Sequence, residues 1–463
     1  MNVNDMLSYQ NISLPDDIRM CQHRGDFEEA IRLIDIRIAD TRTPQCLKYS
    51  LQVHRQMFLR IPMEFPHTVA AGLEIVRKDI PDFTLEELQS LMDQRYIRWI
   101  YVNGEKHLIR SFYASICKAV PGFAMRAQKN LGGAESAVQN SSQAQQRKNI
   151  MSKMMQKGSV TNRIRIRAQL KLNDDQFTPG MFMRAHLPIP ALCQQQSDIR
   201  IERIWPDNGT IAAENAAQRT ICWEEYMEEN HEFTVEYSYL HTATFNDAYH
   251  GHGIPSAVCC DTEEKAPHIV FTPYIRALCQ ELTEGMTDPL MKARAFYDFI
   301  TLNMKYTFMP AYFTLENIAE SCAKNYNGDC GVLALLFITL CRCAGIPAQW
   351  QSGLTAEPDF VGCHDWVRFY VEPYGWIFAD PSYGTGAVRL GMEDNRRFYF
   401  GNLDPYRMVA NCDFQENFTI PKEQWRADPY DNQMGEMETS DRGFWFSDYE
   451  HSMEILCCEE ITD

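Results

Sequence analysis

Three residues in the second half of this 463-residue chain are of the types that carry out nucleophilic chemistry on a carbonyl group. Cys330 follows Asn327-Gly328-Asp329, His364 lies in the segment Cys363-His364-Asp365-Trp366, and Asp380 comes directly before Pro381. A thiolate is a strong nucleophile, an imidazole can take up and return a proton, and a carboxylate can orient that imidazole. The sequence therefore predicts Cys330 as nucleophile, His364 as base and Asp380 as the orienting acid.

A long apolar helix is predicted to begin at Cys330. Its buried face is marked by apolar residues at positions i, i+3, i+4 and i+7, and Gly345 and Pro347 end it; the four residues are Leu333, Leu336, Phe337 and Leu340. Asp329 is the expected N-cap. The free N–H groups and the dipole at this end are expected to lower the pKa of the Cys330 thiol and to receive an oxyanion.

A β-hairpin is expected to bring His364 and Asp380 together. Residues 363–371 alternate as a strand does, 372–375 resemble a turn, and 376–380 form a second strand. A turn between residues 372 and 374 places Asp380 opposite residues 364–367, within reach of His364. Trp366 would share the face of His364 and could wall a cleft. Whether His364 also faces Cys330 depends on how the helix docks on the hairpin.

The segment from about residue 292 to 386 resembles the core of the transglutaminase-like superfamily, in its bacterial form. The matching motifs are Lys305-Tyr306, Gly328-x-Cys330, Ala344-Gly345-Ile346-Pro347-Ala348, His364-x-Trp366-Val367 and Gly375-Trp376-x-x-x-Asp380-Pro381. The resemblance implies a papain-like fold and a Cys330 thioester, resolved by water or by an amine. We expect hydrolysis of peptide or amide bonds. The alternatives are protein-glutamine transamidation and a non-catalytic binding or scaffold protein that keeps the fold.

One feature of the animal transglutaminases is missing. They hold the oxyanion with a tryptophan upstream of the cysteine, and this chain has no tryptophan between Trp223 and Trp350. The candidates for the oxyanion hole and cleft are Tyr312, Tyr326, Gly331 and Trp366, with Tyr306 also nearby. No calcium-loop pattern or zinc spacing occurs, so neither a metal nor a cofactor is expected. The acidic residues between Asp431 and Asp441 are interpreted as a solvated face.

The pattern along the chain predicts an α+β protein of several domains. Residues 1–126 are predicted as a helical domain, in which Asp26 and Thr84 open helices with capping signals. Residues 127–159 resemble a linker, and 160–245 alternate as a small antiparallel β-sandwich. Residues 265–386 are the predicted catalytic core, and 387–463 a C-terminal extension packed on it.

Composition limits the partners. A formal net charge of −18 disfavours nucleic acid and anionic membranes. The start of the chain does not resemble a secretory signal, and the 16 cysteines fit reduced thiols, so a cytoplasmic location is expected. The expected partner is a peptide or protein substrate, and the N-terminal helices could dock another protein or self-associate.

Overall fold

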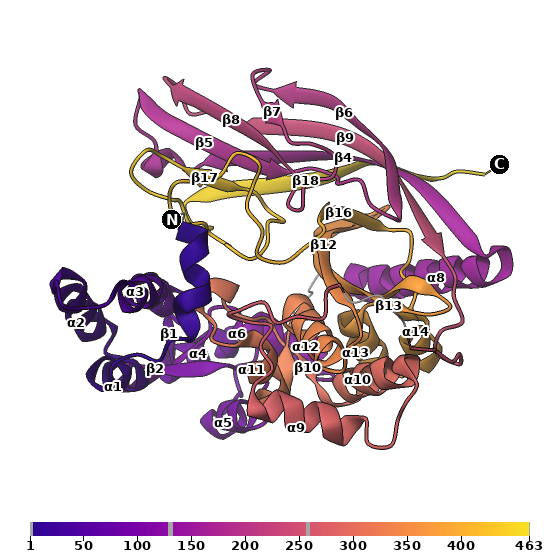
Figure 1. The fold of residues 1–463 in the computed structure, drawn as a ribbon, viewed down its shortest axis with the longest axis horizontal. Helices are drawn as coiled ribbons and strands as arrows, with labels where there is room; N and C mark the ends of the chain where they lie inside the picture. Colours follow the sequence, from indigo (N-terminus) through magenta and orange to yellow (C-terminus); the bar gives the residue numbers. More distant parts are fainter. Residues whose placement is uncertain (1–2, 128–132, 256–259, 463) are drawn as a thin grey trace.

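The computed structural model describes residues 3–127, 133–255 and 260–462. A layer of helices occupies one side of the molecule, and two β-sheets occupy the other, as Figure 1 shows. The last part of the chain runs between the two layers and returns to the sheets. None of the described helices combines the length and apolarity needed to cross a membrane.

The N-terminal region is mainly helical, as predicted. Asp26 Oδ1 accepts a hydrogen bond from Glu29 N, and Thr84 with Glu87 forms a reciprocal capping box. A short sheet in the order β1-β3-β2 was not predicted, since its strands have only two to four residues. The elements are η1 (Val3–Asn11), α1 (Asp16–Arg24), α2 (Phe27–Ala39), α3 (Gln45–Glu64), β1 (His67–Thr68), α4 (Val69–Arg77), α5 (Leu85–Asp93), β2 (Trp99–Val102), β3 (Glu105–Leu108), α6 (Phe112–Ala119) and α7 (Phe123–Arg126).

The segment expected as a linker contains the helix α8 (Gly133–Lys157). Ile150, Met151 and Met154 are buried in the same apolar cluster as the helices of the core. Arg147 of this helix donates from Nε to Glu357 Oε1 at 2.9 Å. The polar composition conceals this helix because only one stripe near its C-terminal end is apolar.

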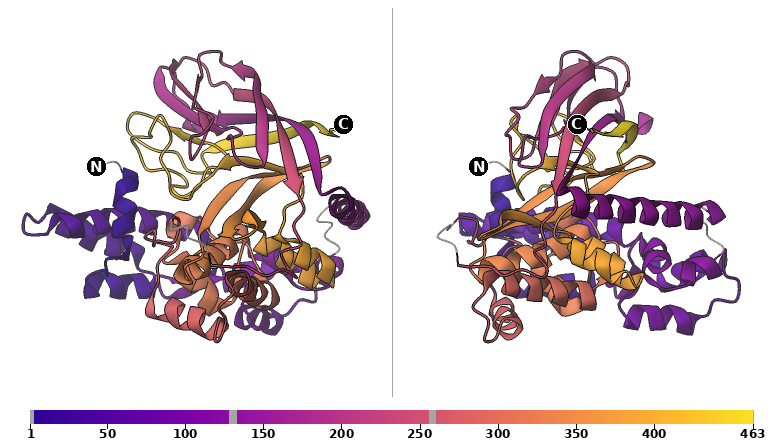
Figure 2. Two further views of the ribbon diagram at one scale, coloured as in Figure 1. Left: turned by 45° about the vertical axis from the view of Figure 1, so that its right-hand side comes forward. Right: turned by 90° about the vertical axis from the view of Figure 1, so that its right-hand side faces the viewer.

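Two four-stranded sheets enclose a second apolar cluster in the part that Figure 2 shows above the helices. The strand at 159–172 alternates in burial as its sequence predicts. Each sheet also takes one strand from the C-terminal segment, which the prediction placed on the catalytic core alone. The sheets are β18-β4-β9-β6 and β17-β5-β8-β7, with β4 (Ser159–Leu172), β5 (Met181–Pro188), β6 (Gln196–Trp205), β7 (Thr210–Ile211), β8 (Thr220–Met227), β9 (Phe233–Thr244), β17 (Glu436–Glu438) and β18 (Tyr449–Glu460). A single helical turn, η2 (Asp174–Gln176), follows β4.

A five-stranded antiparallel sheet in the order β15-β14-β13-β12-β16 has three strands in the predicted core and two, β15 and β16, in the predicted C-terminal extension, with α12 packed against β12 and β13. Its strands are β12 (Ala348–Glu357), β13 (Phe360–Val371), β14 (Gly375–Ala379), β15 (Phe400–Gly401) and β16 (Arg407–Asn411). Around it lie α9 (Pro273–Leu282), α10 (Pro289–Asn303), β10 (Lys305–Tyr306), η3 (Tyr312–Thr314), α11 (Ile318–Asn325), β11 (Asn327–Gly328), α12 (Cys330–Cys343), α13 (Pro381–Arg389) and α14 (Glu393–Phe398).

Strand β12 joins the two layers. Ala348 and Trp350 belong to the apolar cluster that α12 and the N-terminal helices share, whereas Leu354 and Ala356 belong to the cluster of the two four-stranded sheets. A strand that contributes to both cores couples them mechanically, because displacing it disturbs the packing of each.

Candidate active site

Cys330 is the first residue of α12, as predicted, and is partly buried. Asp329 is the N-cap, and its Oδ1 accepts hydrogen bonds from Val332 N at 3.3 Å and from Tyr312 Oη at 2.6 Å. The apolar face of the helix from Leu333 to Leu340 is completely buried. The helix therefore holds the thiol at a fixed place beneath the sheet.

The thiol contacts a residue that the prediction did not name. Cys330 Sγ donates to Asp365 Oδ2 at 3.1 Å, and the described contacts give it no hydrogen bond to His364. The expected lowering of the thiol pKa is wrong for this arrangement. Burial and then the charges of Asp365 and Asp329 raise the pKa of Cys330 well above its usual value, outweighing the helix end.

Asp365 itself is held by the C-terminal segment. Gln433 Nε2 donates to Asp365 Oδ1 at 2.5 Å and to the His364 carbonyl at 3.0 Å. The Asp431 carboxyl lies next to that of Asp365, and Asn411 Nδ2 donates to Asp431 Oδ1 at 2.7 Å. Burial and this neighbouring carboxyl raise the pKa of Asp365 well above its ordinary value, and burial raises that of Asp431 to about 6. Two adjacent buried carboxyls of this kind share a proton.

His364 and Asp380 are paired. His364 Nε2 lies 2.7 Å from Asp380 Oδ2. The hairpin register puts Val367 opposite Ala379, so Asp380 follows the last paired residue of β14, within the predicted range. Asp380 is also the N-cap of α13 and accepts from Tyr383 N at 2.9 Å. Its place is thus fixed by a strand end and a helix start together.

A buried arginine also contacts Asp380, the partner of His364. Arg407 of β16 is wholly buried and places Nη2 3.2 Å from Asp380 Oδ2 and 2.7 Å from Asp404 Oδ2. Burial lowers the pKa of His364, Asp380 raises it, and Arg407 lowers it again. The net effect is a lowered pKa, so the folded chain favours a neutral imidazole. The Asp404-x-x-Arg407 spacing could have indicated the ion pair between those two residues. Only the tertiary fold shows that Arg407 also reaches Asp380.

Two aromatic rings enclose the imidazole. Tyr383 lies edge-on to His364 with ring centroids 4.9 Å apart, and Trp366 lies 6.0 Å away on the same face of β13, as predicted. Trp366 has no exposed surface, and its indole N–H donates to Gln351 Oε1 at 2.9 Å. It therefore supports the histidine from inside the protein and does not wall an open cleft.

Some of the candidate residues for the oxyanion hole lie near Cys330 in the structure, and one does not. Tyr312 and Gly331 lie beside Cys330, since a methyl group on Gly331 would come within 2.3 Å of Tyr312 Oη. Tyr326, which caps α11 in a left-handed conformation with φ 57°, is elsewhere: its ring faces Phe299 and Arg95. Adjacency in sequence was a misleading guide, because this backbone turn redirects the side chain.

Two further groups lie near the thiol: Tyr306, which was named as a nearby candidate, and Lys118, which was not. Burial and the charge of nearby Cys330 raise the pKa of Tyr306 well above its ordinary value. Lys118 of α6 places Nζ 4.0 Å from the centre of the Tyr306 ring, and its charge interacts with Cys330. Lys118 is a cation from the N-terminal region at an otherwise acidic site.

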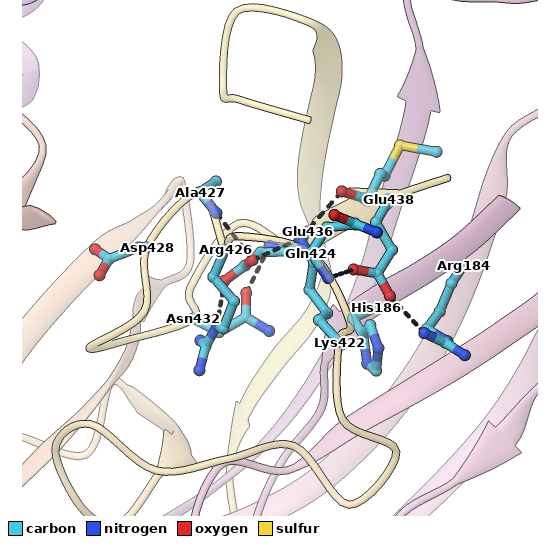
Figure 3. Close-up of polar contacts among 12 residues, drawn as sticks. Arg184, His186, Lys422, Gln424, Arg426, Ala427, Asp428, Asn432, Glu436 and Glu438 are labelled. Atoms are coloured by element: carbon cyan, nitrogen blue, oxygen red, sulfur yellow. Dashed lines mark hydrogen bonds and ion pairs between the residues drawn. The ribbon is translucent and has the colours of Figure 1, made fainter. Parts of the chain in front are cut away.

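The acidic stretch after Asp431 is not the solvated face that we expected. Glu436 is buried between Lys422 Nζ at 3.0 Å and Arg426 Nε at 2.8 Å (Figure 3). Glu438 is buried against Arg184 Nη1 at 2.5 Å. Arg184 comes from the distant strand β5, and Lys422 and Arg426 lie 14 and 10 residues from Glu436, so no short-range pattern reveals these pairs. Among the residues that the structure describes, no group of three or more His, Cys, Asp and Glu is placed to hold a metal ion.

Comparison with known proteins gives a family for the central segment. Residues 276–381 match the model of the transglutaminase-like superfamily, which confirms the resemblance seen in the motifs. The chain is 24% identical over 142 residues to YebA, an uncharacterised protein of Bacillus subtilis (strain 168). That stretch is 26% of this chain and 19% of YebA, so the match spans about a fifth of that relative's length.

Two of the solved bacterial structures that align with parts of this chain are the following. A candidate cysteine protease from Cytophaga hutchinsonii aligns with 66% of this chain and 92% of its own length, at 13% identity and a TM-score of 0.44. The periplasmic domain of TgpA from Pseudomonas aeruginosa aligns with 53% of this chain and 95% of its own, at 13% identity and a TM-score of 0.28.

Proposed function

With a transglutaminase-like domain at residues 276–381 as the premise, we propose that this chain is a cysteine-dependent hydrolase of peptide or amide bonds. Cys330 is the nucleophile, His364 the general base and acid, and Asp380 the group that orients His364. The observation that carries the proposal is the 2.7 Å contact between His364 Nε2 and Asp380 Oδ2. His364 lies on β13, and the next residue of that strand, Asp365, contacts Cys330.

The pairing decides which histidine nitrogen reacts. Because Nε2 is held by Asp380, Nδ1 is the nitrogen left to take the thiol proton. His364 and Asp365 are neighbours in β13 and point to opposite faces of the strand, so the proposed proton transfer requires β13 to shift until the imidazole faces Cys330 Sγ. The contact with Asp365 is the inactive arrangement of the thiol, and the contact with His364 is the reactive arrangement.

The reaction then follows in two stages. The Cys330 thiol passes its proton to His364 Nδ1, and the resulting thiolate adds to the amide carbonyl carbon. Backbone N–H groups at the start of α12 and the Tyr306 hydroxyl are the donors for the oxyanion. His364 returns the proton to the leaving amine as the C–N bond breaks. Water, deprotonated by His364, attacks the thioester and releases the acid and the free thiol.

Transfer to an amine is the second candidate function. His364 has 8% of its surface exposed and Asp380 has none, and a site closed to water would let an amine resolve the thioester. The same three residues serve either outcome, so the products must be compared directly.

The test is incubation of a complex peptide library with the full chain in ¹⁸O-water containing a fluorescent primary amine. Hydrolysis predicts new carboxyl groups labelled with ¹⁸O, and transamidation predicts fluorescent peptides. Both must disappear in Cys330→Ala and His364→Ala and persist in Cys46→Ala, whose thiol is exposed and distant in sequence. Absence of either product from the wild type, with a folded protein, would favour a binding or scaffold role.

A further inference from the structure

We propose that Asp365 is a positioning residue that holds Cys330 as a protonated thiol, and that the C-terminal segment 422–438 keeps Asp365 in this role. The proposal rests on the proposed function, since it concerns the ionisation of the same nucleophile. The 3.1 Å hydrogen bond from Cys330 Sγ to Asp365 Oδ2 is its first support.

The second support is how firmly the C-terminal segment holds the carboxyl. Oδ2 accepts from the thiol, and Oδ1 accepts from Gln433 Nε2 at 2.5 Å. Gln433 also donates to the His364 carbonyl, so one side-chain amide group binds both His364 and Asp365. Asp431 lies against Asp365 from the same segment and is fixed by Asn411. Both oxygens of Asp365 are thus engaged, and its carboxyl stays turned toward the thiol.

The segment is anchored by the buried ion pairs of Figure 3. Glu436 joins Lys422 and Arg426, both of which have almost no exposed side-chain surface. Glu438 Oε1 and Oε2 accept from the backbone N–H groups of Glu423 and Gln424 at 3.1 and 2.9 Å. Arg426 Nη2 donates to the Asp431 carbonyl at 3.1 Å. These contacts fix the loop that carries Asp431 and Gln433 against β13.

The charged groups around the thiol explain the effect. Asp365 and Asp329 oppose formation of a negative thiolate, and Asp431 lies against Asp365. Lys118 is a cation whose charge interacts with Cys330, and the Tyr306 and Tyr312 hydroxyls are neutral. Release transfers one proton and changes no other bond: the Sγ proton passes to His364 Nδ1 once the two side chains meet, and Asp365 keeps Gln433 and Asp431 as partners. A substrate that displaces the thiol from Asp365 would thereby activate it.

The test is the rate of alkylation of Cys330 by iodoacetamide as a function of pH, with each cysteine followed by mass spectrometry. In Asp365→Asn, an amide replaces the charge and can donate to the thiolate. The pH midpoint for Cys330 should fall by about one unit, giving roughly tenfold faster alkylation near neutrality. Gln433→Ala should lower it by less, and Asp394→Asn, an exposed aspartate on α14, should leave it unchanged.

An unchanged midpoint in a folded Asp365→Asn protein would overturn the proposal. If that variant does not fold, Gln433→Ala decides alone, and an unchanged midpoint there has the same meaning. Failure of the proposed function gives a different result, because adding His364→Ala to Asp365→Asn would then leave the alkylation rate of Cys330 unchanged, while Asp365→Asn alone could still shift its midpoint.

Discussion

The residues at the centre of this site belong to two contacts on one strand. His364 pairs with Asp380, and the next residue, Asp365, accepts from Cys330. The first pair is buried and the second is partly buried, and burial makes the charge state of each depend on its neighbours. The residue types and their order were predictable from the sequence. The choice of Asp365 as the thiol's partner was not, because it depends on Asp431 and Gln433, which reach the strand only in the folded chain.

Replacing Asp380 by asparagine should reduce hydrolysis by roughly three orders of magnitude, because the imidazole would adopt the wrong tautomer. An asparagine can still cap α13, so the free energy of unfolding should change much less than activity does. The measurement is kcat/KM on a peptide found in the library screen, alongside urea unfolding. A loss of less than tenfold would show that Asp380 does not orient His364.

At the scale of elements, the start of α12 is the feature most tightly packed around the thiol. Its beginning and the hairpin register were predictable because both are set by local signals, a cap before an apolar stripe and a turn between alternating strands. Tyr326 was misplaced because a left-handed residue ends α11, and a single backbone conformation decides where its ring points.

Replacing Gly331 by alanine should destabilise the protein by about 1–3 kcal/mol and reduce alkylation of Cys330, since the added methyl group would overpack the site. It would come within 2.3 Å of Tyr312 Oη and 2.7 Å of the Trp350 ring. Gly386→Ala in α13 is the matched control, because a methyl group there meets nothing within 4 Å. Equal unfolding free energies for the two variants would contradict this packing.

At the scale of the whole molecule, the C-terminal extension, residues 387–463, links the two layers. It supplies β16 to the core sheet and β17 and β18 to the upper sheets, and its loop reaches the catalytic strand. The alternating strands at 159–172 and 233–244 were predictable, whereas β18, which pairs with the first of them, is separated from it by most of the chain. Long-range pairing of this kind leaves no local pattern.

Glu436→Gln should lower the free energy of unfolding by about 3 kcal/mol, because Lys422 and Arg426 would remain buried with an uncompensated charge. The measurement is equilibrium unfolding in urea. Glu450→Gln on the exposed face of β18 is the matched control and should change stability by less than about 0.5 kcal/mol. Similar values for both variants would mean that the ion pairs of Figure 3 do not anchor the segment.

Stability should also depend on pH through Asp428, whose pKa is raised to about 7 by burial and by Asp431. The folded chain holds this proton, whereas the unfolded chain releases it above about pH 4, so the contribution is greatest below that pH and is lost as the pH rises to about 7. Asp428→Asn should therefore raise the unfolding free energy by about 2 kcal/mol near pH 8 and leave it unchanged near pH 4. An equal change at both pH values would contradict the buried, protonated state.

The central claim, that Cys330 is a nucleophile served by His364, is tested most directly by cysteine-resolved alkylation of the full chain near neutral pH. In the Asp365→Asn background, where the thiol is no longer held, adding His364→Ala should lower the rate at Cys330 by at least about tenfold, while the rate at the exposed thiol of Cys46 stays the same. An unchanged rate at Cys330 in the folded variant would contradict the account, since His364 would then have no part in forming the thiolate.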